Sequence, residues 1–194
     1  MPSGYAPFWM ATAVTPNETL LRAGTGAGPG GAGSEYLDLA FADRYSFIAF
    51  AESPPNLVGG IFASAAGTPA ITLPTAINPS LSGSPVSVTN LAASANLLVY
   101  TINADWGTPV VVNATISKTY LGNATEYTLP DLTALSGFGD TLPQSGDTVN
   151  VTVSAVESSL TLEEMANQDD ADLFLLPDGT NVTFAEKYLN YVLP

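Results

Sequence analysis

The chain of 194 residues contains neither cysteine nor histidine. Without cysteine it cannot form a disulfide bond or a thiolate zinc site. Without histidine it has no Ser-His-Asp relay, no imidazole-ligated metal and no near-neutral proton shuttle. Catalysis would be left to paired carboxylates, lysine or tyrosine. We therefore predict that the chain is not an enzyme and that it has no cofactor, with calcium as the one alternative.

Basic charge is also scarce. Four basic residues stand against 18 acidic ones, and the net charge is −14. Four scattered cations cannot neutralise a nucleic-acid backbone or bind an anionic membrane surface. No run approaches the roughly 20 apolar residues that a membrane span needs. We therefore expect no nucleic-acid partner and no membrane insertion.

The chain has few charged residues of either sign, 11%, but 46% of it is hydrophobic. The hydrophobic content predicts a folded chain with a real core. The low charge implies a surface of Ser, Thr, Asn and Gly, which is more typical of secreted, cell-surface and virion β-proteins than of cytosolic enzymes. The first residues lack an apolar signal core, so we expect either a processed chain or another route out of the cell, such as lysis.

Period-two alternation is clearest in residues 148–156. Val149, Val151, Val153 and Ala155 share one face there, and polar residues occupy the other. This pattern predicts a strand with one buried face. Turn-forming residues separate this strand from others at intervals of about ten residues, the rhythm of an antiparallel β-sandwich. The other strands predicted in this stretch are 97–102, 110–116 and 125–129.

The N-terminal half predicts further strands. Residues 5–15 form either a first strand of the same sheet or an arm that pairs with a neighbouring subunit. The glycine-rich segment 24–33 is interpreted as a hairpin loop and not as a dinucleotide fingerprint, because Pro29 interrupts it and no helix follows. Segments 36–41 and 45–50 predict a hairpin across a short polar turn.

Residues 56–62 predict a weaker strand, in which Gly59-Gly60 suggests a bulge. Four prolines between 68 and 85 exclude a central strand and predict a linker. The domain boundary is therefore placed there, with a β-rich region at 1–80 and a sandwich at 84–194.

The C-terminal part predicts one helix and one hairpin. Residues 161–167 favour a short helix near 160–168, capped by Ser158, Ser159 or Thr161. Segments 173–176 and 181–184 predict a closing hairpin. The apolar tail that follows is expected to pack against the fold.

A resemblance rests on residues 124–132, the glycine-rich loop after them and the strand 148–156. This order of Tyr-Thr-Leu-Pro strand, loop and alternating strand resembles the fibronectin type III-like modules of bacterial surface proteins. The resemblance covers about residues 84–156, and it implies an Ig-like β-sandwich with Trp106 in its core. Such modules serve display, spacing and adhesion, so the resemblance implies a structural use.

Candidate sites follow from residue types. Apolar arms at both chain ends predict subunit contacts through Phe8, Trp9, Val14, Tyr188 and Tyr191, because free termini are normally polar. An acidic cluster offers oxygen ligands for calcium, and a solvated acidic turn is the alternative; its members are Asp169, Asp170, Asp172 and Asp178.

Two further sets of residues suggest binding or modification. Five aromatic residues are candidates for a platform on which sugars stack, and packing in the core is the alternative; they are Trp9, Trp106, Tyr100, Tyr120 and Tyr127. Asn-x-Thr sequons predict glycosylation if the source glycosylates; they lie at Asn17, Asn113, Asn123, Asn150 and Asn181, with Asn113, Asn123 and Asn150 as the principal candidates.

The sequence thus predicts an all-β, antiparallel sandwich of the fibronectin type III-like or Ig-like kind. Its predicted function is that of a non-enzymatic structural or interaction protein of an extracellular assembly: a surface layer, a filament or a virion. Its partners would be copies of itself or other assembly subunits. The alternatives are a carbohydrate-binding module, with a glycan as partner, and a calcium-dependent adhesin.

Overall fold

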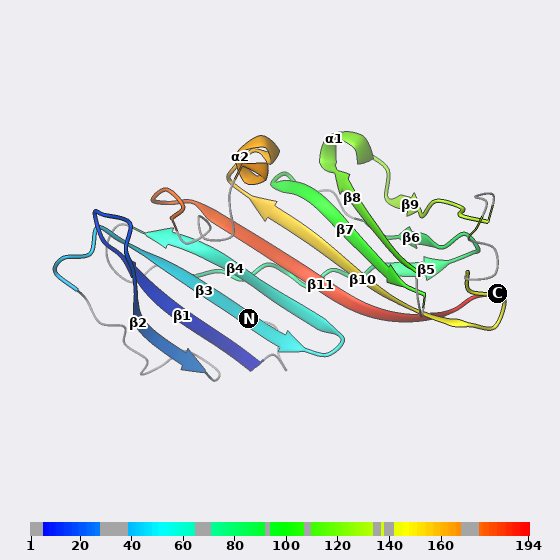
Figure 1. The fold of residues 1–194 in the computed structure, drawn as a ribbon, viewed down its shortest axis with the longest axis horizontal. Coiled ribbons are helices and arrows are strands. Elements are labelled where there is room, and N and C mark those ends of the chain that lie inside the picture. The colour runs from blue at the N-terminus through cyan, green and yellow to red at the C-terminus, as the bar shows by residue number, and fades with distance from the viewer. Residues whose placement is uncertain are drawn as a thin grey trace. The chain divides into compact units, whose positions relative to one another are not determined.

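The computed structural model describes residues 6–27, 39–64, 71–91, 94–106, 110–133, 137, 142–167 and 175–194 (Figure 1). These residues form antiparallel sheets with two short helices, so the predicted all-β class is confirmed. The strands are β1 (Ala6–Val14), β2 (Leu20–Ala27), β3 (Arg44–Ser53), β4 (Asn56–Ser64), β5 (Ser80–Ser82), β6 (Ser87–Thr89), β7 (Leu97–Asp105), β8 (Val111–Ser117), β9 (Glu126–Thr128), β10 (Thr148–Ser158) and β11 (Asn181–Val192), and the helices are α1 (Lys118–Leu121) and α2 (Leu162–Ala166).

The chain divides into two units, and it passes between them more than once. The first unit contains residues 1–75 and 157–185, and the second contains 76–156 and 186–194. The sequence placed a single boundary near 80–84 instead. The difference arises because β10 and β11 each run from one unit into the other, so residues 157–185 belong with the N-terminal strands.

The first unit is a sheet in the order β2-β1-β3-β4-β11. Its core follows from alternation along β3, where Tyr45, Phe47 and Ala49 are buried on one face. Two small residues of the neighbouring strand β1, Ala11 and Ala13, pack in the same cluster. Aromatic rings thus lie against alanines, which leave room for them.

Gly59 and Gly60 make close packing possible in β4. The pairing of β3 with β4 keeps one continuous register through both glycines, so the predicted bulge is wrong. A Cβ atom on Gly59 would lie 2.6 Å from Cζ of Phe184, and one on Gly60 would lie 2.8 Å from the carbonyl oxygen of Val182. The Cβ atom of Phe50 on β3 would also lie 2.9 Å from a Cβ atom on Gly59. The glycines are therefore required by their neighbours on β3 and β11 and not by an irregular backbone.

The second unit is a sandwich. One sheet has the order β11-β10-β7-β8 and the other the order β5-β6-β9. Its core takes buried residues from both sheets, among them Val88 of β6, Ile102 of β7 and Val151 of β10. The alternation predicted for 148–156 is confirmed, because Val149, Val151, Val153 and Ala155 are buried.

Both helices begin at a capping residue. The hydroxyl of Thr161 accepts a hydrogen bond from the backbone N–H of Glu164, whose carboxylate in turn accepts from the backbone N–H of Thr161. This capping box confirms the helix predicted near 160–168. Helix α1 was not predicted; Ser117 caps it and Gly122 ends it, with φ of 58°. A helix of four residues is too short to show a hydrophobic period.

Two predicted hairpins differ from the structure. Strand β3 forms its hairpin with β4, across Pro54 and Pro55, and residues 39–43 form a turn before it. Residues 36–38 lie outside the described residues. The second hairpin was predicted from 173–176 and 181–184, but residue 181 begins a strand of 12 residues, and 175–176 are not in a strand. Residues 173–174 lie outside the description.

The glycine-rich segment 24–33 is not a loop throughout. Its first four residues belong to β2, which pairs with β1 with a register shift between Ala11 and Thr12. Residues 28–33 lie outside the described ranges.

Candidate functional site

The predicted N-terminal arm is a strand inside its own sheet. β1 pairs with β2 on one side and with β3 on the other. Phe8 is half-buried and its ring centroid lies 5.0 Å from that of Phe50, while Trp9 is also half-buried and Val14 is fully buried. The first-strand alternative therefore holds, and Val14 has no surface to offer a neighbour. Subunit contacts of Phe8 and Trp9 stay a prediction.

The C-terminal arm is the second half of β11, in the second unit. Tyr188 is 48% exposed and donates a hydrogen bond from Oη to the carboxylate of Glu186 at 3.1 Å. Tyr191 is half-buried and donates from Oη to the carbonyl oxygen of Gly83 at 3.2 Å. The hydrogen bond of Tyr191 is made within its own chain. The exposed ring of Tyr188 is the part of this arm that a neighbouring subunit could contact.

The calcium hypothesis concerns residues that are mostly not described. Asp169, Asp170 and Asp172 lie outside the described ranges. Asp178 is exposed in the loop before β11. Among the residues that the structure describes, no three acidic side chains are grouped to hold a metal ion. The calcium site stays a prediction.

All five sequon asparagines are exposed. Asn113 lies on β8, Asn150 on β10 and Asn123 in the turn after α1; Asn17 and Asn181 are also exposed. Each can therefore be reached by a modifying enzyme, and glycosylation stays a prediction.

The aromatic residues proposed as a sugar platform do not form one surface. Tyr100 is 2% exposed and belongs to the core of the second unit. Tyr120 and Tyr127 form an edge-to-face pair with ring centroids 6.5 Å apart. Trp9 packs in the first unit and Trp106 in the second. Of these five, Trp106 lines the pocket described below.

Strand β8 ends the order of the large sheet of the second unit. It pairs with β7 in a continuous register of seven residue pairs, without a bulge. Its sequence, Val-Val-Asn-Ala-Thr-Ile-Ser, holds no charge, proline or glycine. Val111 is 51% exposed, and Asn113 and Thr115 on the same face are exposed too. Most edge strands of monomeric proteins carry a charge, proline or bulge that prevents pairing with another chain. β8 has none of these.

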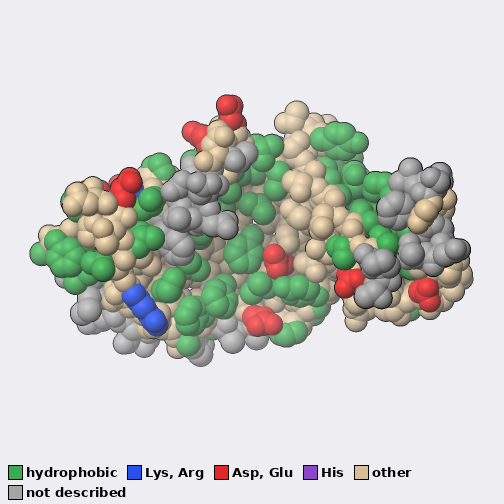
Figure 2. All heavy atoms as spheres, viewed as in Figure 1, with side chains coloured by type: hydrophobic (Ala, Val, Ile, Leu, Met, Phe, Trp, Pro, Cys, Tyr) green, Lys and Arg blue, Asp and Glu red, His purple; other side chains and the backbone are tan. Residues whose placement is uncertain are grey.

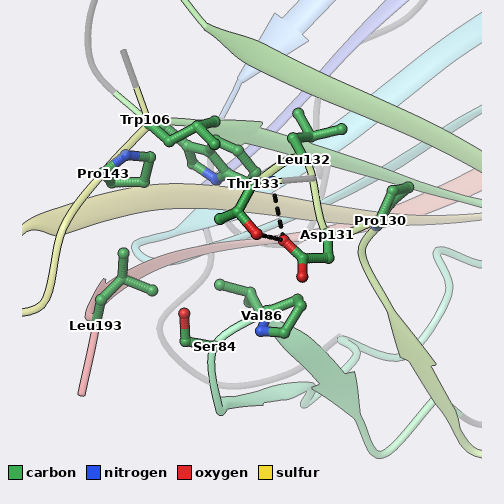
Figure 3. A pocket seen from close by; sticks show the side chains of 11 residues that line it. Ser84, Val86, Trp106, Pro130, Asp131, Leu132, Thr133, Pro143 and Leu193 are labelled. Atoms are coloured by element: carbon green, nitrogen blue, oxygen red, sulfur yellow. Dashed lines mark hydrogen bonds between the residues drawn. The ribbon is translucent and has the colours of Figure 1, made fainter. Parts of the chain in front are cut away.

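A pocket of about 190 Å³ lies in the second unit (Figure 3). Its walls come from segments that follow or precede strands: 84–86, 106, 130–133, 142–143 and 193. Eight of the eleven lining residues are apolar, including Pro85, Pro130 and Pro143. The three polar lining residues are Ser84, Asp131 and Thr133.

Asp131 is held in the pocket wall by Thr133. Its Oδ1 accepts hydrogen bonds from the backbone N–H of Thr133 at 2.9 Å and from the Thr133 hydroxyl at 2.6 Å. The hydroxyl bond, and then the backbone bond, lower the pKa of Asp131 below its usual 3.8. The carboxylate is therefore ionised throughout the neutral range.

Trp106 also lines this pocket, and its ring carries an unpaired hydrogen-bond donor. Its Nε1 is buried and has no hydrogen-bond partner among the described residues. Buried polar groups are nearly always paired, so an unpaired donor beside a pocket is a feature that requires an explanation. The sequence placed Trp106 in the core and did not reveal the pocket.

The surface is poor in basic groups, as the composition requires. Figure 2 shows one face on which hydrophobic and uncharged atoms predominate and acidic groups are scattered. Lys187 donates to the side-chain oxygen of Asn78, and Lys118 donates to the carbonyl oxygen of Ala95 at 2.6 Å. Within the described ranges, no helix has the length and apolar character to span a membrane.

The chain matches no family model, and neither the curated proteins nor the solved structures include a match to it. The resemblance to fibronectin type III-like modules therefore stays a prediction from the sequence.

Proposed function

We propose that this chain is a non-enzymatic structural or interaction protein of an extracellular assembly, in which subunits join through strand β8. The observation that carries the proposal is the regular and uncharged edge of β8. The extracellular setting is supported by the low charge, and the non-enzymatic role by the absence of cysteine and histidine.

Pairing of two β8 strands is the simplest contact that this edge permits. An antiparallel pair about a two-fold axis would use the same patch on both subunits. It would satisfy the outward-facing N–H and C=O groups of both strands, each hydrogen bond contributing about 0.5–1.5 kcal/mol net. It would also cover the exposed side chain of Val111. A second contact elsewhere on the subunit would extend the dimer into a layer or filament.

Net charge opposes this association. Two subunits that each carry −14 repel one another. Salt screens that repulsion over about 8–10 Å at physiological ionic strength. Association should therefore strengthen as salt is raised.

Asn113→Lys and Asn150→Lys form a matched pair of variants. Both asparagines are exposed, but β8 is an edge strand whereas β10 has a strand on either side. Light scattering should show concentration-dependent association of the intact chain, loss of that association in Asn113→Lys, and no change in Asn150→Lys.

An intact chain that stays monomeric at high concentration and high salt would contradict the proposal, as would equal behaviour of the two variants. The protein should come from a host that does not glycosylate. A glycan on Asn113 would cover the same edge, so glycosylation at Asn113 and pairing of β8 exclude each other.

A further inference from the structure

The turn before β3 presents an apolar side chain to solvent. Phe41 is 56% exposed, and it has the largest side chain without a polar atom among the exposed large hydrophobic residues described. The turn that carries it is anchored. The backbone N–H of Ala42 donates to the carbonyl oxygen of Leu39, and that of Asp43 donates to the carbonyl oxygen of Val14, both at 2.8 Å. Because Leu39 and Ala42 also pack against the core of the first unit, little order would be lost when the ring of Phe41 binds.

Two leucines widen this apolar surface. Leu20 and Leu21 begin β2, and each is 38% exposed. Leu20 pairs with Val14, which also bonds the turn, so the start of β2 and the turn lie at the same end of the first unit. Figure 2 shows hydrophobic atoms gathered at this end. Contiguous exposed apolar surface commonly marks a site of interaction.

The pocket of the second unit matches Phe41 in size and in chemistry. Its volume is about 190 Å³, and an apolar cavity of about 150 Å³ engineered in another protein binds benzene. Three prolines, three leucines and Val86 present hydrocarbon to it. Its three polar lining residues are all exposed, and the buried Nε1 of Trp106 has no surface to offer. A phenyl ring can therefore fill the pocket without leaving a polar group of its own unpaired.

Charge favours contact between these two surfaces in two copies. Arg22 and Arg44, two of the four basic residues of the chain, lie near the Phe41 end of the first unit. They balance Glu18 and Asp43 there, and Asp43 pairs with Arg44 at 3.4 Å. The pocket carries the exposed carboxylate of Asp131 and no basic side chain. The balanced end, with Arg22 exposed, can therefore approach the acidic rim, whereas subunits of net charge −14 otherwise repel one another.

We propose that Phe41 of one copy inserts into the pocket of a second copy. Ring and pocket are different surfaces, one on each unit, so the contact is heterologous and leaves a free ring and a free pocket at its two ends. The contact can therefore repeat. It rests on the proposed assembly function, for which it supplies the second contact that extends dimers paired through β8.

Two variants isolate one pocket and one ring for an NMR titration. Phe41→Ala keeps the pocket and loses the ring, whereas Leu132→Asp keeps the ring and places a charge in the pocket lining. Both also carry Asn113→Lys, which prevents pairing of β8. Isotope-labelled Phe41→Ala titrated with unlabelled Leu132→Asp should show a saturable shift of the indole N–H signal of Trp106. The signal of Trp9, which packs in the first unit, should not move.

The unlabelled partner provides the controls. Removing Phe41 from it as well should weaken the titration by about tenfold to a hundredfold, which corresponds to burial of one phenylalanine side chain. Leu162→Ala removes another exposed apolar side chain, 44% exposed on α2, and should leave the titration unchanged. If Leu132→Asp does not fold, a partner with an intact pocket serves the same purpose.

Three results would overturn the inference. The first is an equal titration by partners with and without Phe41. The second is a Trp106 signal that Phe41→Ala alone shifts in the dilute chain, because the ring would then occupy the pocket of its own chain. The third is Phe41-dependent binding to phosphatidylcholine vesicles with no shift of Trp106 in the mixture, which would assign the turn to a lipid surface.

Light scattering on chains with an unchanged β8 separates this contact from strand pairing. Phe41→Ala should reduce larger assemblies to dimers, and Leu162→Ala should not. If Asn113→Lys leaves association unchanged while the NMR mixture still shifts Trp106, pairing through β8 is wrong and the Phe41 contact stands. If Asn113→Lys abolishes association but the mixture shows no shift, the Phe41 contact alone is wrong.

Discussion

Gly59 and Gly60 show how one missing side chain fixes the distance between strands. Neither glycine has a positive φ, so their role is space and not backbone freedom. Their neighbours differ in kind. Gly59 faces the far end of the Phe184 ring, whereas Gly60 faces the backbone oxygen of Val182. A ring end can be removed by substitution, and a backbone oxygen cannot.

We expect Gly59→Ala and Gly60→Ala each to lower the free energy of unfolding by about 1–3 kcal/mol, the usual cost of overpacking. In a Phe184→Leu background the cost of Gly59→Ala should fall, because Cζ and Cε1 of the ring are gone. The cost of Gly60→Ala should not change. Urea unfolding of the three single and two double variants, beside wild type, measures both couplings. If Phe184→Leu reduced the destabilisation by Gly59→Ala and by Gly60→Ala equally, the Phe184 ring would not be the specific obstacle at Gly59.

Helix α2 shows how the stability of a short helix depends on the cap at its N-terminus. Five residues are too few for a helix to form alone, and its first turn is held by the reciprocal hydrogen bonds of Thr161 and Glu164. Hydrogen bonds from the backbone N–H of Thr161 and then from its hydroxyl lower the pKa of Glu164 below 4.5. The carboxylate form is thus the form that caps the helix.

This lowered pKa links capping to pH. A carboxyl group with a lower pKa in the folded state stabilises the fold above its unfolded pKa, and that stability is lost as the pH falls through the folded pKa. We expect Glu164→Gln to be less stable than wild type at pH 7 and to approach it below about pH 4. In Thr161→Ala, an NMR titration should show the pKa of Glu164 rising only part of the way toward 4.5, because the hydroxyl is lost and the backbone N–H of residue 161 stays. An unchanged pKa in that variant would contradict the hydrogen bond from the Thr161 hydroxyl.

At the scale of the whole molecule, strands that are far apart in the sequence pair with each other. Ala63 donates from its backbone N–H to the carbonyl oxygen of Thr180 at 2.9 Å, and both residues belong to the first unit. Residues 181–185 of β11 therefore need β4 for their sheet, although more than a hundred residues separate them from it.

The fragment 84–194, the domain predicted from the sequence, should accordingly fold only in part. We expect amides of residues 181–185 to lose protection from hydrogen exchange in this fragment, because β4 is absent. Amides of β7 and β8 should keep theirs. Adding a fragment of residues 1–83 should restore the protection of 181–185. Full protection in the isolated fragment would show that the second unit and β11 are independent of β4.

At the level of elements, the sequence predicted what local pattern determines. The alternation in 148–156 identified β10 and its buried face. The segment 161–167, with Thr161 among three candidate caps, identified α2, because a period or a cap depends on neighbouring residues. The absence of cysteine and histidine excluded whole classes of chemistry. The exposed position of Asn150 followed from the polar face of that strand.

Only the tertiary structure decided which strands meet. Segments with strong β propensity both precede and follow β3 in the sequence. The alternation of residues does not show whether β3 pairs with 36–41 or with β4. The pocket around Trp106 gathers residues from 84 to 193, and no local pattern relates them. Whether an edge such as β8 is left open also depends on the order of strands in the sheet. Local patterns determine secondary structure, whereas the packing of distant segments determines edges and pockets.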